Sequence, residues 1–172
     1  MLRQAALGVA MLSTSGMAFN LFNPFKGSFE PKLKSANPEI SRLDIDSVNR
    51  TFVDQDHRQV MLHGVNVVYK VDPYIPSDGA FDIEDSLNDE DIANLKKWGF
   101  NLVRLGVMWE AVERSPGVYD ETYLDKVETL INKLGDAGIY TLVDAHQDVF
   151  ARTICGEGMP DFYAADAIGR RP

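Results

Sequence analysis

The feature that most constrains the fold is a structural unit that occurs twice between residues 89 and 148. In the first copy, a helical pattern closes at Gly99 and leads into the strand-like run 101–107. In the second, a helical pattern closes at Gly138 and leads into the run 140–145. A helix that ends at glycine and feeds a short β-branched run is typical of β/α units around a parallel sheet. Polar side chains follow both runs, at the strand ends where such sheets bind ligands.

The composition is that of an ordinary globular domain. The 172 residues are 45% hydrophobic and 25% charged, which is enough for a single domain with a core. The net charge of −9 argues against nucleic acid as a partner, because phosphate binding needs clustered lysine and arginine.

The first 18 residues have the pattern of a secretory signal peptide. Arg3 precedes an apolar, uncharged stretch over residues 5–17 that ends among small residues. We expect residues 1–18 to be removed and the protein to be secreted, or to enter an endomembrane or lysosome-like compartment, rather than to remain in the cytoplasm. A disordered start is the alternative.

Two further features bear on this route. Asn49-Arg50-Thr51 is an N-glycosylation acceptor pattern in a secreted protein, although such triplets are frequent by chance. Cys155 is the single cysteine, so the chain cannot form an internal disulfide.

The order of elements predicts an incomplete (β/α)8 TIM barrel of class α/β. Residues 19–45 read as an irregular lead-in segment, and residues 46–172 as the amino-terminal part of the barrel domain. Runs 50–53 and 59–62 predict a β-hairpin ahead of a first parallel strand at 62–69. With the two repeated units this makes about three βα units. An open doubly wound sheet fits less well, because no glycine-rich phosphate loop follows the first strand.

Helices are expected from about Asn88 and from about Asp120, with a third after Asp161. The long loop 71–86 between the first strand and the first helix favours a binding role. The residues predicted to be buried on the first two helices are Ile92, Leu95, Trp98, Tyr123, Leu124, Val127, Leu130, Ile131 and Leu134.

Strand side chains alternate, which divides each strand between the helix layer and the barrel interior. The residues predicted to face the helices are Val103, Leu105, Val107, Thr141, Val143 and Ala145. Those predicted to face the interior are Gly64, Asn66, Val68, Lys70, Leu102, Arg104, Gly106, Leu142, Asp144, His146 and Asp148.

The inward polar residues allow several chemistries. Asp144, His146 and Asp148 form an array that can hold sugar hydroxyls, orient a catalytic carboxylate or ligate a metal. Arg104 needs a carboxylate partner, in a structural ion pair or in an active site. Lys70, at the rim, is either solvated or the amine of a Schiff-base enzyme.

Two residues follow the second strand directly. Trp109 is suited to stacking on a sugar ring and equally to packing under a loop. Glu110 has the chemistry for acid–base work, but nothing in the sequence places a second carboxylate near it.

Several segments resemble the endoglycoceramidase group of glycoside hydrolase family five: Trp98–Glu110, Pro116–Tyr119, Tyr123–Leu124, Gly138–Asp148 and Cys155–Gly158. The resemblance implies a (β/α)8 barrel that cleaves β-glycosidic bonds with retention and releases the glycan of glycosphingolipids from ceramide. It implies that Lys70, Asp144, His146 and Asp148 line the sugar site nearest the scissile bond. It also implies that Arg104 holds the nucleophilic carboxylate.

The same resemblance locates the acid/base after strand four and the nucleophile after strand seven, so no catalytic carboxylate is assigned here, and Glu157 belongs to a structural turn. We therefore expect an incomplete enzyme that is inactive alone and whose partner is the missing carboxyl-terminal part of the barrel. The expected ligand is a carbohydrate or glycolipid, with transient membrane-surface contact through the lipid. No cofactor and no metal is expected.

Two alternatives remain. One is a non-catalytic carbohydrate-binding remnant, for which the strand edges left by an incomplete barrel are an aggregation hazard. The other is a metal-dependent TIM-barrel hydrolase that uses Asp144, His146 and Asp148.

Overall fold

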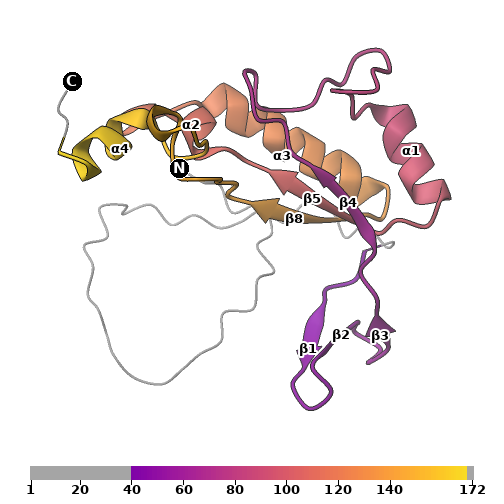
Figure 1. Cartoon of the computed structure of the whole chain (residues 1–172). Coiled ribbons are helices and arrows are strands. Elements are labelled where there is room, and N and C mark those ends of the chain that lie inside the picture. The colour runs from indigo at the N-terminus through magenta and orange to yellow at the C-terminus, as the bar shows by residue number, and fades with distance from the viewer. Residues whose placement is uncertain (1–39, 170–172) are drawn as a thin grey trace.

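The computed structural model describes residues 40–169 (Figure 1). The predicted signal peptide and residues 19–39 of the predicted lead-in lie outside the described residues. Within the described part of the chain, no helix is long and apolar enough to cross a bilayer.

The centre of the fold is a three-stranded parallel sheet. Its strands are β4 (Gly64–Val67), β5 (Leu102–Gly106) and β8 (Tyr140–Asp144), in the order β4-β5-β8. Both pairings are parallel and unshifted, so that Val65 lies beside Val103 and Val103 beside Thr141. All three predicted strands are confirmed, and each is shorter than its predicted run, the first most of all. The parallel register brings the three carboxyl ends to one edge.

Glycine is needed where β4 begins against β5. A Cβ atom on Gly64 would lie 1.7 Å from the carbonyl oxygen of Leu102. Only the absence of a side chain allows the two backbones to approach at this position.

Two helices cover one face of the sheet (Figure 1). Helix α1 (Asp89–Lys97) begins with a capping box between Asn88 and Asp91, and α3 (Glu121–Asp136) begins where Asp120 accepts a hydrogen bond from the Tyr123 amide. Both predicted starts are confirmed. These caps satisfy backbone N–H groups that a helix leaves unpaired at its first turn.

The core lies between this helix layer and the sheet. Its most deeply buried large side chains are Leu105, Met108, Leu134, Ile139 and Val103. The predicted stripe on α3 is confirmed, since four of its residues are buried and Leu124 and Ile131 pack against the core.

Trp98 is not buried, contrary to the prediction. Ile92 and Leu95 are buried, but Trp98 follows the last residue of α1 as its C-cap and is 65% exposed. The spacing 92–95–98 is correct for one helical stripe. The helix ends before the third position, and the stripe ends with it.

The predicted alternation holds within the strands. Val103 and Leu105 are buried on the helix side, and Arg104 lies on the opposite face. Ala145, also predicted to face the helices, is exposed. Because β8 ends at Asp144, the alternation no longer governs the next residue.

A second, antiparallel sheet precedes β4. It consists of β1 (Asp44–Asp46), β2 (Thr51–Val53) and β3 (Gln59–Val60) in sequence order, and its β2–β3 pair is the predicted hairpin. Asp44 and Ile45, assigned by sequence to the irregular lead-in, instead begin β1. In Figure 1 this sheet lies beyond the amino-terminal end of β4.

Short elements fill the loops at the carboxyl-terminal edge. After β5 the chain forms α2 (Trp109–Val112) and the ribbon β6 (Glu113–Ser115) with β7 (Val118–Tyr119), none of which was predicted. After β8 it forms the 3-10 turn η1 (Arg152–Ile154) and the predicted third helix, α4 (Asp161–Ala167).

Neighbouring substitutions on α1 test which of its residues contribute to the core. Leu95→Ala removes a buried side chain and should lower the free energy of unfolding by about 2–5 kcal/mol. Trp98→Ala removes a larger but exposed side chain and should change it by about 0.5 kcal/mol or less. Urea unfolding followed by circular dichroism measures both, and a larger loss for Trp98→Ala would contradict this core assignment.

Candidate functional site

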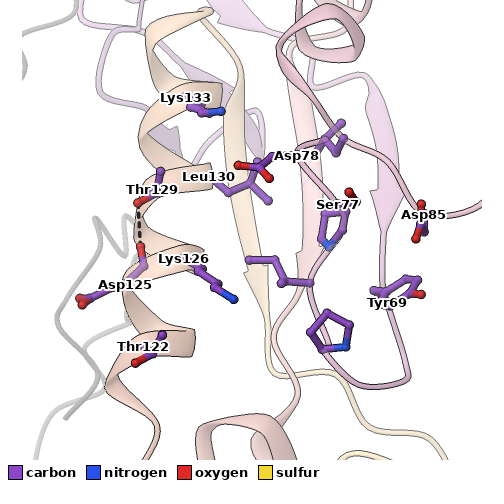
Figure 2. Close-up of a pocket in the computed structure, with 14 residues that line it drawn as sticks. Tyr69, Ser77, Asp78, Asp85, Thr122, Asp125, Lys126, Thr129, Leu130 and Lys133 are labelled. Carbon is purple, nitrogen blue, oxygen red and sulfur yellow. Dashed lines mark hydrogen bonds between the residues drawn. The ribbon is translucent and has the colours of Figure 1, made fainter. Parts of the chain in front are cut away.

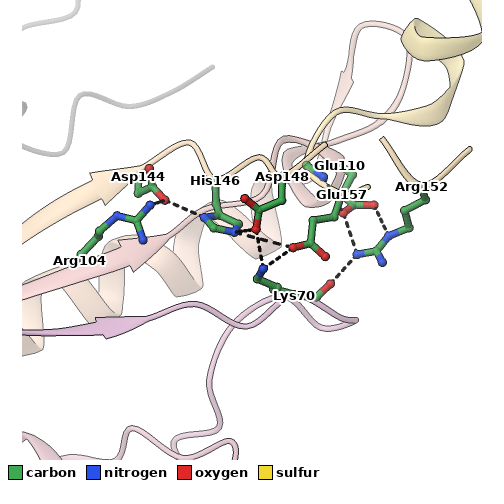
Figure 3. Close-up of polar contacts among 9 residues, drawn as sticks. Lys70, Arg104, Glu110, Asp144, His146, Asp148, Arg152 and Glu157 are labelled. Carbon is green, nitrogen blue, oxygen red and sulfur yellow. Dashed lines mark hydrogen bonds and ion pairs between the residues drawn. The ribbon is translucent and has the colours of Figure 1, made fainter. Parts of the chain in front are cut away.

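Six charged or polar side chains meet where the three parallel strands end (Figure 3). We call them the polar network: Lys70, Arg104, Asp144, His146, Asp148 and Glu157. Arg104 comes from β5, Asp144 is the last residue of β8, and the other four come from the loops that follow β4 and β8. The structure thus brings together five of the residues predicted to face the interior and adds Glu157.

The inner half of the network is centred on Asp144. Its Oδ2 atom lies 2.7 Å from an Nη2 nitrogen of Arg104 and 3.0 Å from Nδ1 of His146. The direct pairing of β5 with β8, which sets Gly106 beside Asp144, brings the arginine within reach. The carboxylate partner that we predicted for Arg104 is therefore Asp144.

The outer half is centred on Lys70. Its Nζ lies 2.7 Å from Oδ2 of Asp148 and 2.5 Å from Oε1 of Glu157. These contacts raise the pKa of Lys70, and the hydrogen bond from Lys70 lowers the pKa of Asp148. These contacts favour the ammonium form of Lys70 over the free amine that a Schiff-base nucleophile needs.

A backbone bridge sets the two outer carboxylates side by side. The amide of Asp148 donates to the carbonyl of Glu157 at 3.1 Å, and the reverse hydrogen bond is 2.8 Å. Gly156 and Gly158 flank Glu157, and a Cβ on either would lie within 2.5 Å of backbone oxygen. Glycine on both sides of Glu157 therefore allows this segment to pack closely against the backbone of residues 146–149.

One nitrogen of the network has no hydrogen bond. His146 is 8% exposed and donates from Nδ1 to Asp144, whereas its buried Nε2 makes no hydrogen bond among the described residues. Nε2 lies 3.2 Å from Oδ2 of Asp148 without forming a hydrogen bond. A buried polar atom without a partner is costly unless a ligand supplies one.

The residues able to hold a metal differ from those predicted. His146, Asp148 and Glu157 each offer a ligand atom within 4.8 Å of the others, but Asp144 is engaged with Arg104 and the other ring nitrogen of His146. The ammonium of Lys70 contacts both carboxylates of this group and supplies their positive counter-charge. The expected absence of a metal or cofactor remains a prediction.

A second cluster, missed by the sequence analysis, joins the loops. Arg152 contacts both carboxylate oxygens of Glu110, at 2.7 and 2.8 Å, and donates to the carbonyl of Lys70 at 2.5 Å. Glu110 also accepts from the Gly158 amide at 3.2 Å, and its side chain is only 11% exposed. Glu110, considered above for acid–base chemistry, is therefore the anchor of an ion pair that ties together the loops after β4, β5 and β8.

Trp109 lies in a third cluster. Its indole N–H donates to Glu113 at 2.8 Å, and its ring centroid is 5.1 Å from that of Tyr163. Tyr163 donates to the same carboxylate, which raises the pKa of its own hydroxyl. The contacts of Trp109 are thus with α4 and β6 rather than with the polar network, and its role in stacking on sugar remains a prediction.

The loop 71–86 lines a separate cavity of about 450 Å³ against α3 (Figure 2). Its walls include Ile75, Pro76 and Leu87 on one side and Leu130 on the other, with Lys126 and Lys133 at the helix surface. No residue of the polar network lines it, and the predicted binding role of this loop stays a prediction.

Comparison with known proteins finds matches over most of the described residues. The model of the cellulase family (glycosyl hydrolase family 5) matches residues 53–167. The chain is 39% identical over 130 residues to an endoglycoceramidase of Cyanea nozakii, covering 76% of this chain and 24% of that protein. It is 37% identical over 133 residues to endoglycoceramidase I of Rhodococcus hoagii, covering 77% and 25%. The chain therefore spans about a quarter of the length of these curated relatives.

Among solved structures, the crystal structure of an endogalactoceramidase matches with a TM-score of 0.56 and 27% identity. The match covers 72% of this chain and 30% of that one. It agrees with a partial (β/α)8 barrel, as predicted from the repeated units.

Removing the ammonium of Lys70 tests the outer half of the network. In Lys70→Met the pKa of Asp148 should rise toward its ordinary value, because the hydrogen bond and charge that lower it are gone. A lowered carboxyl pKa stabilises the folded chain above the unfolded pKa, and this contribution is lost as pH falls through the folded value. The variant should therefore lose less stability on acidification than the unsubstituted chain.

The Asp148 pKa is read from its side-chain carbon resonance against pH, and stability from urea unfolding at several pH values. Lys126→Met, which removes a lysine outside the network, is the control. An unchanged Asp148 titration in Lys70→Met would contradict the ion pair.

The cluster around Arg152 is tested by stability. Arg152→Met leaves the nearly buried carboxylate of Glu110 without its cation and should lower the free energy of unfolding by about 1–3 kcal/mol. Arg114→Met is the matched control, since Arg114 makes long ion pairs of 3.4 and 3.6 Å with Asp72 and Asp120 and lies over the ring of Tyr74 at the surface, and its loss should cost about 1 kcal/mol or less. Equal losses for the two variants, measured by urea unfolding, would remove the anchoring role.

Proposed function

The chain belongs to glycosyl hydrolase family 5, and we propose that it forms the amino-terminal part of a retaining glycosidase barrel that acts on glycosphingolipids. In this proposal the polar network is the wall of the sugar site nearest the bond that is cleaved. The ligand is the glycan, and the ceramide brings the protein into transient contact with a membrane surface.

The observation that carries the proposal is the continuity of the polar network across three strand ends. Arg104, Asp144 and His146 form one chain of contacts, and Asp148, Lys70 and Glu157 continue it outward (Figure 3). A sugar ring presents several hydroxyls, each able to donate and accept. A contiguous array of fixed acceptors and donors is what recognises such a ring.

Individual roles follow from the contacts. His146 Nε2, buried and without a hydrogen bond, is the natural partner of one sugar hydroxyl. Lys70 and Asp148 are each about half exposed at the outer end, where they can exchange part of their mutual contact for further hydroxyls. Among the described residues Arg104 contacts Asp144 through one terminal nitrogen, and its other N–H donors are suited to a nucleophilic carboxylate.

The network itself does not provide the catalytic pair. Retaining hydrolysis uses two carboxyl groups about 5 Å apart, one of which must hold a proton for the leaving group. Asp148 and Glu157 have the proximity, but both contact the ammonium of Lys70, which lowers the pKa of Asp148 and so opposes the protonated form that the reaction needs in one of the pair. From the resemblance to the endoglycoceramidase group, we infer that the acid/base and the nucleophile come from strands four and seven of the barrel, and that the 172-residue chain alone is inactive.

A chimaeric enzyme tests the function. Residues 53–167 replace the corresponding segment of the Cyanea nozakii endoglycoceramidase, and glycan release from a fluorescent glycosphingolipid is measured. The unsubstituted chimaera should be active. Asp144→Asn and His146→Ala should each lower kcat/KM by about 10- to 100-fold, which is the effect of losing one hydrogen bond involving a charged group.

Asp136→Asn is the matched control, because it makes the same chemical change on the exposed end of α3 and should leave kcat/KM unchanged. The 172-residue chain is assayed in parallel and should release no glycan. A folded but inactive chimaera, or full activity in Asp144→Asn, would contradict the proposed sugar site. Release by the chain alone would contradict the inferred location of the catalytic pair.

A further inference from the structure

We propose that Asn49 is an N-glycosylation site and carries the single N-linked oligosaccharide of this chain. The inference does not rest on the proposed glycosidase function, since it concerns a different sheet at the opposite end of the fold. It assigns a role to the one sequence pattern that the polar network leaves unexplained.

In the 172-residue sequence, Asn49 is the only asparagine that is followed two residues later by serine or threonine with a residue other than proline between them. The transferase that attaches N-linked oligosaccharides requires this triplet, which it binds as an accessible segment. A single acceptor makes the outcome binary, because occupancy adds one oligosaccharide or none.

The structure places this triplet on the surface. Asn49 lies in the turn of residues 47–50 that joins β1 to β2, and it is exposed. Arg50, the middle residue of the triplet, is also exposed, and Thr51 begins β2. A turn at the tip of a two-stranded ribbon offers its side chains to a bulky modification with no cost in packing.

The local hydrogen bonds are compatible with the attached sugar. The carboxylate of Asp46 accepts from the Asn49 amide N–H at 3.1 Å and from its side-chain Nδ2 at 2.7 Å. A glycosylated Nδ2 retains one N–H, so it can still donate to Asp46. The turn is therefore preserved after modification.

The reaction balances without any group from this protein beyond the side-chain amide. A bond forms between Nδ2 of Asn49 and the anomeric carbon of the first N-acetylglucosamine. The bond between that carbon and the diphosphate of a lipid-linked oligosaccharide donor breaks. The Nδ2 proton leaves, and the lipid diphosphate departs with the bonding electron pair.

The position also shows which surface the oligosaccharide would lie beside. Ile45 and Phe52 are cross-strand neighbours beside this turn and are about half exposed, and Val48 is 87% exposed. A hydrated oligosaccharide on Asn49 stands next to these apolar side chains. It also lies at the amino-terminal end of β4, away from the polar network at the carboxyl-terminal ends, and so leaves that site open (Figure 1).

The experiment is expression of the full chain in eukaryotic cells, once with its own first residues and once behind a foreign secretory leader. Intact mass is measured before and after an amidase that removes N-linked oligosaccharides and converts the modified asparagine to aspartate. The leader-directed chain should carry one oligosaccharide, and peptide mapping should find aspartate at position 49. Modification with its own first residues would additionally support residues 1–18 as a signal peptide.

Three variants make the result specific. Asn49→Gln and Thr51→Ala should abolish the modification, whereas Thr51→Ser keeps a hydroxyl at the required place and should retain it. Scoring the cell-associated pool together with the medium makes the result independent of how well each variant folds. An unmodified leader-directed chain, or a modification that persists in Asn49→Gln, would overturn the proposal.

Discussion

The parallel pairing of β5 with both β4 and β8 is the constraint on which the rest of the structure depends. The register is unbroken, so that Asn66, Arg104 and Leu142 lie in one row across the sheet. Two consequences follow from this one arrangement. The helix-side residues of all three strands face one covered side, which becomes the core. The loops after the strands all leave from one edge, where Lys70 contacts Asp148 and Glu157 of the loop after β8.

Much of this arrangement could be predicted from the sequence because it is periodic. Alternation along β5 and β8 assigned Arg104 and Asp144 to the same face, and their 2.7 Å contact agrees with that assignment. Helical spacing on α3 correctly identified its buried stripe. These predictions succeed because a local period of two or of 3.6 residues determines which side of an element a residue occupies. The failures at Trp98 and Ala145 occur just past the last residue of an element, although His146 and Asp148, also past the end of β8, lie with Asp144 as the alternation predicted.

The parts that sequence could not supply are contacts between loops. Glu110 and Arg152 are 42 residues apart, and nothing in either neighbourhood marks them as partners. Trp109 is similar, because α2 was not predicted, its indole donates to Glu113 just past the end of that helix, and its ring contacts Tyr163 of α4. Such contacts depend on the three-dimensional paths of irregular segments. The one signal in the sequence was that Arg152, a cation, and Glu110, a carboxylate, both follow parallel strands. This signal does not specify that the two form a pair.

The loop after β8 contacts Lys70 at two groups, its backbone carbonyl and its side-chain ammonium. Arg152 binds its backbone carbonyl, and Asp148 and Glu157 bind its ammonium, so the lysine is fixed without any group from outside the described residues. Apart from His146, the network contains two cations, Lys70 and Arg104, and three carboxylates, each of which contacts one of these cations. An opposite charge within contact distance offsets part of the cost of holding each charge away from water. Because the backbone bridge between Asp148 and Glu157 sets these two carboxylates side by side, one ammonium, that of Lys70, contacts both of them.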